Sequence, residues 1–469
     1  MIYLHDMKNL FTKLKPKKLS KTTAVKKKKY FITFVILLIL AVVAVTGRRS
    51  PFGNKWEGFI PDSSIFDNLS SGNQEGNKYT NFFFEIYDLI KNKHWNKLSD
   101  EQLNTIAKLG IEKLTNDQLI TVPLTKEDLN KVIVEQMSNM NDEEKKDFIS
   151  KLSDLVLANL EPFGRSRLYT TKKKEELSNT VKNINPNINH YETLEIDENS
   201  TDQDIKLAYD NKLVQLKNQE QTPEVKQKIK AVETAFTVLN DIGAKEVYDE
   251  KGVDPTLDYR LITPRIFYFH IKKFSPTTVQ ELQRVTEGVD EGNELDTLII
   301  DLRGNIGGAI DGLPYFLGPF IGQNQYAYQF FSRGEKKDFI TKTGWLPSLV
   351  RYKKVIVLID GNAQSSAEVF AAVIKKYNVG IVVGETTKGW GTVESVFKIN
   401  NQPDPENEEY SVFLVHSLTL REDSVPIEGK GVDPTIDISN PNWENELFKY
   451  FHYQELVNVV RDLVNTPVN

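Results

Sequence analysis

The chain has 469 residues, 39% hydrophobic and 26% charged, which is the composition of a globular protein long enough for two or three domains. It contains no cysteine, which excludes disulfides, thiol catalysis and cysteine-based metal sites, and its six histidines form no His-x-x-x-His pair, so we expect no metal and no cofactor. The net charge is −6, but residues 1–29 hold ten lysines and one aspartate, so the remainder is strongly acidic and we expect no nucleic-acid partner.

An uncharged apolar run at residues 30–46 directly follows four consecutive lysines, Lys26–Lys29. This pattern predicts a single transmembrane helix over residues 30–47, preceded by a basic cytoplasmic tail at residues 1–29. The rest of the chain would then lie outside the cytoplasm, on the cell membrane. A cleaved signal peptide is the alternative, but the long basic lead and the lack of a clear small-x-small cleavage site favour an anchor.

Residues 48–78 are rich in Ser, Gly, Asn and Pro and are expected to form a linker, whereas residues 79–185 have a helical pattern. Ser99-Asp-Glu-Gln102 predicts a capping box, and Gly110 is expected to end the helix that it starts.

Residues 188–252 have the pattern of a helical hairpin. Thr201 is placed to cap one helix, and a second helix presents Val232, Phe236 and Leu239 at helical spacing. The stretches at 190–209 and 236–249 resemble a J domain. That family's His-Pro-Asp loop, which engages Hsp70, aligns with Asn218-Gln219-Glu220, so we expect the fold without Hsp70 as a partner.

Residues 258–469 alternate strands and helices, which predicts an α/β core with parallel strand pairs. The expected strands are 265–274, 298–302, 355–359, 381–383 and 412–420, with a helix capped at Thr278 and a last helix over 443–464. Residues 323–350 show no clear period. Motif glycines follow the carboxyl ends of these strands, where α/β sheets bind ligands.

Ser365 lies where the strand 355–359 turns into a helix, in the stretch Ser365-Ser-Ala-Glu368. At such a turn a hydroxyl is exposed beside free backbone N–H groups, which suits a nucleophile. The alternative is that Ser365 or Ser366 only caps the helix.

Two glycine-rich turns accompany this stretch: Asp301-Leu-Arg303-Gly-Asn-Ile-Gly307-Gly308 before it, and the segment 384–394 after it. Together the three motifs resemble the C-terminal processing (tail-specific) serine peptidases. The resemblance implies a crotonase-like α/β peptidase core with Ser365 as nucleophile and an oxyanion hole formed by the N–H groups of Gly307 and Ser366. We expect Arg303 to brace the glycine turn by bonding its carbonyls.

Residues 157–169 resemble the element that precedes the PDZ domain in these peptidases. No PDZ domain follows, and the J-domain-like segment stands in its place.

The chain departs from this family at the general base. The position of the family's catalytic lysine is Trp390, and that of its assisting glutamine is Glu394. Three residues could replace the lysine: Lys388 on the same loop, His416 on the late strand, and Glu394 alone or orienting His416. Each could instead be an ordinary structural or surface residue.

The sequence therefore predicts a membrane-anchored serine endopeptidase, a hydrolase that cleaves extracytoplasmic protein or peptide substrates. The main alternative is an inactive pseudo-peptidase that binds proteins, because tryptophan cannot act as a base. A membrane co-chaperone is a weaker third hypothesis, since the His-Pro-Asp loop is missing.

Overall fold

The computed structural model describes residues 78–118, 121–289, 294–421 and 423–468. The tail, the transmembrane helix predicted for residues 30–47 and all but the last residue of the linker lie outside these ranges. No helix within the described ranges is both long and apolar enough to span a membrane.

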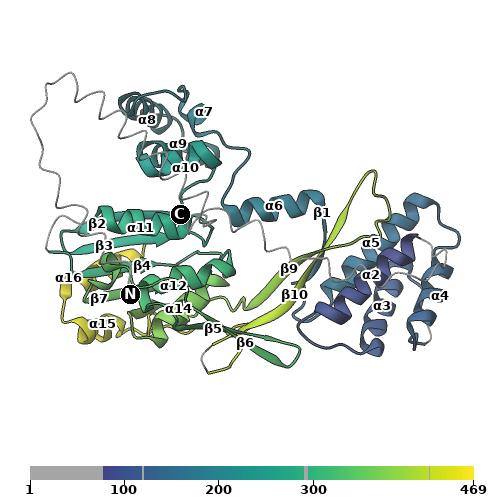
Figure 1. Ribbon diagram of the computed structural model, residues 1–469. Coiled ribbons are helices and arrows are strands. Elements are labelled where there is room, and N and C mark those ends of the chain that lie inside the picture. The colour runs from purple at the N-terminus through teal and green to yellow at the C-terminus, as the bar shows by residue number, and fades with distance from the viewer. Residues whose placement is uncertain (1–77, 119–120, 290–293, 422, 469) are drawn as a thin grey trace, which may run out of the picture. The chain divides into compact units, whose positions relative to one another are not determined.

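Four helices form the first part of the described chain, as the pattern of residues 79–185 predicts (Figure 1). They are α2 (Lys78–Lys93), α3 (Asp100–Thr115), α4 (Lys126–Gln136) and α5 (Asp142–Ala158), and β1 (Arg167–Thr170) and α6 (Thr171–Lys182) follow. The capping box at Ser99 is present, with Gln102 N–H donating to Ser99 Oγ and Ser99 N–H donating to Gln102 Oε1.

Gly110 does not end α3, which continues to Thr115 and terminates at Asn116 in the left-handed conformation. The glycine is instead a point of close contact between helices. A Cβ at position 110 would come within 2.9 Å of Leu152 Cδ1, on α5. The prediction was wrong because a glycine inside a helix can serve packing as well as termination.

The J-domain-like segment contains α7 (His190–Leu194), α8 (Asp202–Lys217), α9 (Pro223–Asn240) and α10 (Ile242–Lys251). Thr201 caps α8 as predicted, and α8 packs against α9 through the stacked rings of Tyr209 and Phe236, whose centroids are 4.1 Å apart. Asn218-Gln219-Glu220 lies in the loop between these two helices, where the Gln221 amide donates to carbonyls at the end of α8.

A six-stranded sheet forms the centre of the α/β core, in the order β11-β8-β7-β4-β3-β2. Its strands are β2 (Leu257–Thr263), β3 (Ile266–Ile271), β4 (Thr297–Asp301), β7 (Lys354–Ile359), β8 (Ile381–Gly384) and β11 (Ile436–Asp437). The pairs from β3 to β11 are parallel, and β2 pairs antiparallel with β3. The predicted α/β class is therefore confirmed.

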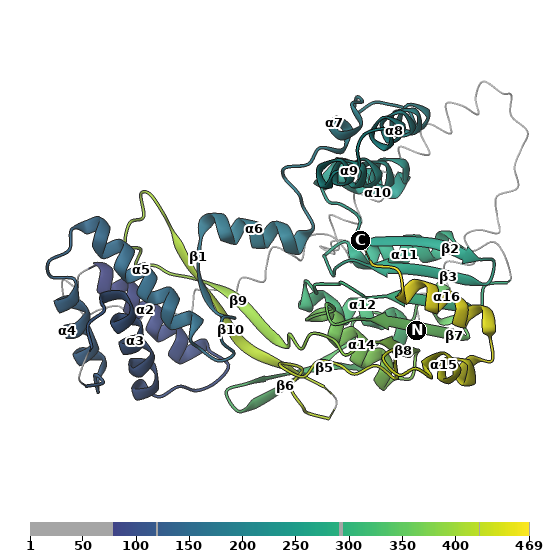
Figure 2. The ribbon, with the colours of Figure 1, turned by 180° about the vertical axis from the view of Figure 1, so that it is seen from behind.

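Helices cover both faces of this sheet because both faces of its central strands are apolar (Figures 1 and 2). Leu298 and Ile300 face the cluster that includes α11 (Thr278–Gly288), α12 (Leu313–Ile321) and α14 (Ser366–Lys376). Ile299, between them, faces α15 (Trp443–Phe451) and α16 (Gln454–Val464).

Three local predictions for the core need correction. The last helix is two helices, because His452 adopts a left-handed φ of 49° between α15 and α16. Thr278 is the first residue of α11 and makes no cap for it. The stretch 323–350 holds a hairpin, β5 (Tyr326–Ser332) and β6 (Glu335–Ile340), and the short α13 (Pro347–Val350). Strand β6 is mostly exposed, so no apolar alternation marks it.

A second sheet joins this core to the N-terminal helices. In it β10 (Tyr410–Leu420) pairs with β1, β5 and β9 (Thr392–Lys398). At one end of the β9–β10 pair Val393 packs into the α14 cluster, and at the other end Val412 and Leu414 pack among the N-terminal helices. One pair of strands therefore supports both regions.

Candidate active site

Ser365 lies at the turn between β7 and α14 in a conformation that side chains rarely adopt, with φ 58° and ψ −121°. Ser365 also stands in the position of a helix N-cap, with its N–H donating to the Glu368 carboxylate three residues later. Strain of this kind persists only where the surrounding structure enforces it, and it is typical of a nucleophile presented at a strand-to-helix turn.

The carboxylate of Glu368 enforces this turn. It is fully buried and accepts four hydrogen bonds, two at each oxygen. Ser365 N–H and Trp390 N–H donate to Oε2, each at 2.8 Å, while the Thr387 hydroxyl and Gly389 N–H donate to Oε1 at 2.6 and 2.7 Å. Burial raises the pKa of Glu368, and the four donors oppose that rise. The same oxygen thus holds the backbone of Ser365 and of Trp390.

The glycine turn after β4 lies against Ser365. Gly307 has φ 87°, and a Cβ at this position would come within 2.6 Å of Ser365 Cβ and 3.1 Å of Ser365 Oγ. Only glycine fits this contact. The Asn305 side chain fixes the turn, because its amide donates to the Ile271 carbonyl at 2.7 Å and its oxygen accepts Gly307 N–H at 2.8 Å.

The two residues predicted for the oxyanion hole, Gly307 and Ser366, both lie near the Ser365 turn, but they differ in their hydrogen bonds. Gly307 N–H is engaged by Asn305, so it can serve an oxyanion only if this bond is shared or broken. Ser366 is the first residue of α14, and its buried hydroxyl donates to the Gly308 carbonyl at 3.2 Å. Its side chain is thereby turned to the glycine turn.

Arg303 does not brace the glycine turn as expected. Its guanidinium forms a buried ion pair with Asp301 at 2.7 Å and donates to the carbonyls of Leu463 and Thr466 at the end of α16. It therefore ties the C-terminal helix to the end of β4.

Trp390 is held by contacts on three sides. Its backbone N–H is bound to Glu368, and its indole Nε1 donates to Glu394 Oε1 at 3.4 Å. The guanidinium carbon of Arg165 lies 3.4 Å from the centroid of its ring, a close cation–π stack. An aromatic ring fixed in this way occupies the loop at which the resembling peptidases carry their base.

Arg165 comes from the loop after α5 and connects the N-terminal helices with this site. Besides stacking on Trp390, it donates from Nε and Nη2 to Glu428 Oε1, at 3.3 and 3.2 Å. Glu428 in turn accepts Gly391 N–H at 2.8 Å. Loop 387–391 is thus held by two carboxylates, Glu368 on one side and Glu428 on the other.

Glu394, a candidate base, points into the same cluster. Burial raises the pKa of its carboxyl, while donors from Thr392 and Trp390 and the charge of Arg165 oppose the rise. Its bonds go to the Thr392 hydroxyl and the Trp390 indole, and none to Ser365 among the described residues.

Lys388 and His416 make different contacts. Lys388 is exposed, and its Nζ lies 5.4 Å from the centroid of the Trp390 ring. His416 lies at an irregularity of β10, with Nδ1 2.9 Å from the Ser417 hydroxyl. Burial lowers the pKa of His416, and the Lys337 charge adds to that effect. Within the described ranges neither residue is hydrogen-bonded to Ser365, so the structure gathers Ser365, the glycine turn and Trp390, but not a paired base.

Sequence reasoning missed the roles of Asn305, Arg165 and Glu428. Asn305 lies inside a recognised motif, so its place before the glycines could have indicated a turn-fixing amide. Arg165 carries no comparable signal, because it is far from Trp390 in the sequence and only the fold brings them together.

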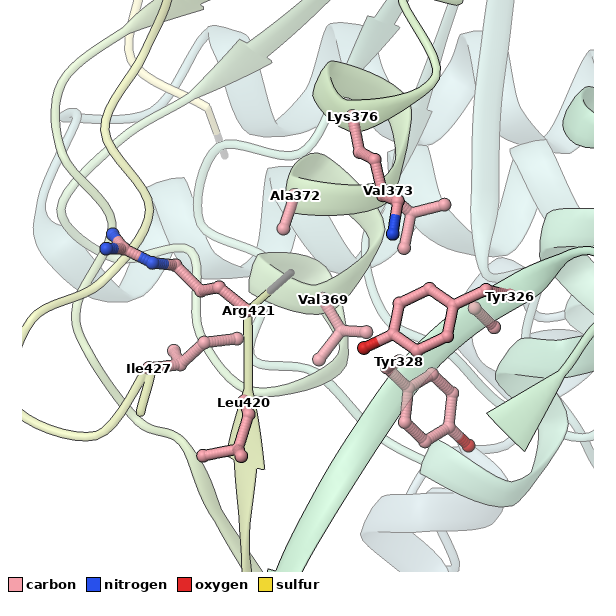
Figure 3. Close-up of a pocket in the computed structure, with 10 residues that line it drawn as sticks. Tyr326, Tyr328, Val369, Ala372, Val373, Lys376, Leu420, Arg421 and Ile427 are labelled. Atoms are coloured by element: carbon pink, nitrogen blue, oxygen red, sulfur yellow. The ribbon is translucent and has the colours of Figure 1, made fainter. Parts of the chain in front are cut away.

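The small cavity behind the turn lies between α14, β5 and β10 (Figure 3). Val369 and Val373 point into it from α14, opposite Tyr326 and Leu420. It holds about 10 Å³, room for roughly one water molecule. The helix that carries Ser365 is therefore closely packed from behind.

Residues 265–438 match the model of peptidase family S41, and residues 189–249 match that of the DnaJ domain. The carboxy-terminal processing protease CtpB of Bacillus subtilis is 29% identical over 180 residues, 38% of this chain and 34% of CtpB. A carboxy-terminal-processing protease of Bartonella bacilliformis is 24% identical over 211 residues, 43% of this chain and 46% of that protein. The chain thus matches less than half the length of these relatives.

A solved photosystem II D1 C-terminal processing protease is similar to 77% of this chain and covers 93% of its own, with 12% identity and a TM-score of 0.46. The likeness is too distant to support any argument about activity. The two resemblances predicted from the motifs, to C-terminal processing peptidases and to the J domain, are confirmed by the family matches.

Replacing Glu368 by glutamine should loosen loop 387–391. A carboxamide has one acceptor oxygen, so at least one pair of the four donors would face an NH₂ group and lose its partner, at a cost of about 1–3 kcal/mol for each buried donor. Hydrogen exchange should show faster deuteration of residues 387–391 in Glu368→Gln. Glu385→Gln, at an exposed carboxylate beside the same loop, is the control. Equal exchange in both variants would contradict the anchoring role of Glu368.

Proposed function

Because residues 265–438 match peptidase family S41, we propose that this chain is a serine endopeptidase of the C-terminal processing type. Ser365 would be its nucleophile, and extracytoplasmic proteins its substrates. The observation that carries the proposal is the strained backbone of Ser365 at the strand-to-helix turn, against the bare Cα of Gly307. A serine that only capped a helix would have no need of this conformation.

The reaction would follow the usual course of acyl transfer. The Ser365 hydroxyl adds to the scissile carbonyl carbon while a base takes its proton, and the resulting oxyanion is bound by backbone N–H groups. The proton then goes to the leaving amine as the C–N bond breaks, and water releases the acyl group. Ser366 N–H, at the start of α14, is the first candidate donor, and Gly307 N–H would join it after leaving Asn305.

We favour Lys388 as the base. It lies on the loop that Glu368 binds to the Ser365 turn, its side chain is exposed and able to move, and its ammonium already lies beside the Trp390 ring. Glu394 and His416 remain the alternatives, but both are engaged by neighbouring hydroxyls. Hydrogen bonds of catalytic groups are often absent in a resting enzyme and form with the substrate.

Cleavage of an unfolded protein such as β-casein tests the activity and its base together. The full chain should cleave it, Ser365→Ala should not, and Ser366→Ala should retain activity. A lysine base predicts a rate still rising in the alkaline range. A His416 base predicts a rise below the ordinary histidine pKa of 6.5, because burial lowers that pKa, and a Glu394 base predicts a rise above 4.5, because burial raises it. Cleavage that survives Ser365→Ala would contradict the proposal.

The second candidate is a pseudo-peptidase that binds proteins without cleaving them. Trp390 and its stack with Arg165 favour it, because the ring stands at the family's lysine position. Among the described residues, none of the three candidate bases is hydrogen-bonded to Ser365. In that case the native chain would bind casein without cutting it.

The J-domain-like segment, residues 188–252, would present substrates to or regulate the peptidase domain, residues 258–469. The Asn218-Gln219-Glu220 loop lacks the His-Pro-Asp residues, so stimulation of an Hsp70 is not part of the proposal.

We further propose that residues 30–47 anchor the protein in the cell membrane with residues 1–29 in the cytoplasm and Ser365 outside. The support is the lysine-flanked apolar run in the sequence.

Protease added to intact cells or spheroplasts tests this topology. It should degrade the body of the protein and leave a short lysine-rich fragment, while a cytoplasmic marker protein survives. If the body survives until the membrane is permeabilised, the orientation is wrong.

A further inference from the structure

Two adjoining cavities form a groove along α3 and the loop after α5. One holds about 290 Å³ and the other about 410 Å³. They share Ile106, Asn159 and Phe163 in their walls, so they are direct neighbours. Together the two cavities are large enough to hold several side chains of a bound ligand.

The walls of this groove combine polar side chains, such as Asn96, Gln102 and Thr105, with exposed apolar ones. Leu109 is 58% exposed and Phe163 is 71% exposed, although both are large hydrophobic side chains. Leu98 and Leu155 add apolar walls, and Leu160 is buried beside them. Single exposed hydrophobic residues are ordinary on a protein surface, but Leu109 and Phe163 line the same cavity, where one ligand can contact both.

Several contacts also hold the walls of the groove in place. Gly110 lets α3 approach Leu152 on α5. The Glu161 carbonyl accepts Trp95 Nε1 at 2.7 Å and lies 2.9 Å from His94 Nε2, which fixes the loop that carries Phe163. A preformed surface of this kind loses little entropy when a ligand binds.

The same loop runs from the groove to the candidate active site. Phe163 is two residues from Arg165, which stacks on Trp390, so the two Cα atoms can be at most about 7 Å apart. Ser166, the next residue, accepts Val415 N–H, and Val415 pairs with Glu394 in the β9–β10 ladder. One short segment of chain, residues 163–166, therefore joins the groove to the Trp390 ring and to β10.

We propose that this groove holds an apolar segment of the unfolded polypeptide that the peptidase domain cleaves. The inference rests on the proposed function, and it assigns to the N-terminal helices the substrate contact for which no PDZ domain is found in the sequence. Continuity with the Arg165–Trp390 stack selects this occupant. The polar groups at the edge of the groove include Glu101 and Lys113, of opposite charge, which gives no preference for a charged ligand.

Binding to an inactive chain tests the groove separately from catalysis. Fluorescein-labelled β-casein is titrated with the full-length Ser365→Ala protein, and the same titration is made with Leu109→Asp and Phe163→Asp added. Each aspartate should weaken binding by about tenfold or more, because it places a charge against apolar ligand surface. Leu124→Asp is the matched control, since Leu124 is 76% exposed on the same helical region and lines neither cavity.

Two results would overturn the proposal: no casein binding by Ser365→Ala, or equal binding by the groove variants and Leu124→Asp. Sedimentation of the same proteins identifies the rival occupant. If Phe163→Asp splits a dimer without changing casein affinity, the groove holds a second copy of the chain. Failure of the proposed function would appear elsewhere, as casein that is bound by the native chain but never cut.

Discussion

The buried carboxylate of Glu368 is the interaction on which the site depends. A carboxylate without solvent must be satisfied by donors, and this one receives four, from both sides of the Ser365 turn. Its oxygen Oε2 binds the backbone of Ser365 and of Trp390, so the two residues cannot move independently. Because the strain at Ser365 and the position of loop 387–391 have the same anchor, a change at either one is transmitted to the other.

Trp390 is the unusual residue on the loop that Glu368 holds. At position 390 the loop carries an indole that is stacked on Arg165 and bonded to Glu394. Arg165 also couples the loop to the N-terminal helices, since it lies between Phe163 and the strands of the second sheet. Ser365 is therefore connected, through Glu368 and then the Trp390–Arg165 stack, to the region that we propose binds substrate.

The sequence predicted the parts of the fold that depend on local pattern. The buried strands β4 and β7 are continuous apolar runs, and the glycine motifs follow their carboxyl ends, so the turn at Ser365 is predictable from the residues around it. The β5–β6 hairpin is not, because β6 is largely exposed and has no alternation. Arg165 was missed for a different reason: its partners Trp390 and Glu428 are distant in sequence, and no local signal records a tertiary stack. Whether a base lies close enough to pair with Ser365 depends on long-range packing in the same way.

The most direct measurement is the reaction of the full chain with a fluorophosphonate, followed by peptide mapping by mass spectrometry. A hydroxyl held at the turn by Glu368 and activated by a base should form a single phosphonyl adduct on Ser365, absent in Ser365→Ala and unchanged in Ser366→Ala. The rate should rise with pH as the base loses its proton. A folded chain that gives no adduct on Ser365 at any pH would contradict the peptidase account and leave the site as a protein-binding surface around Trp390.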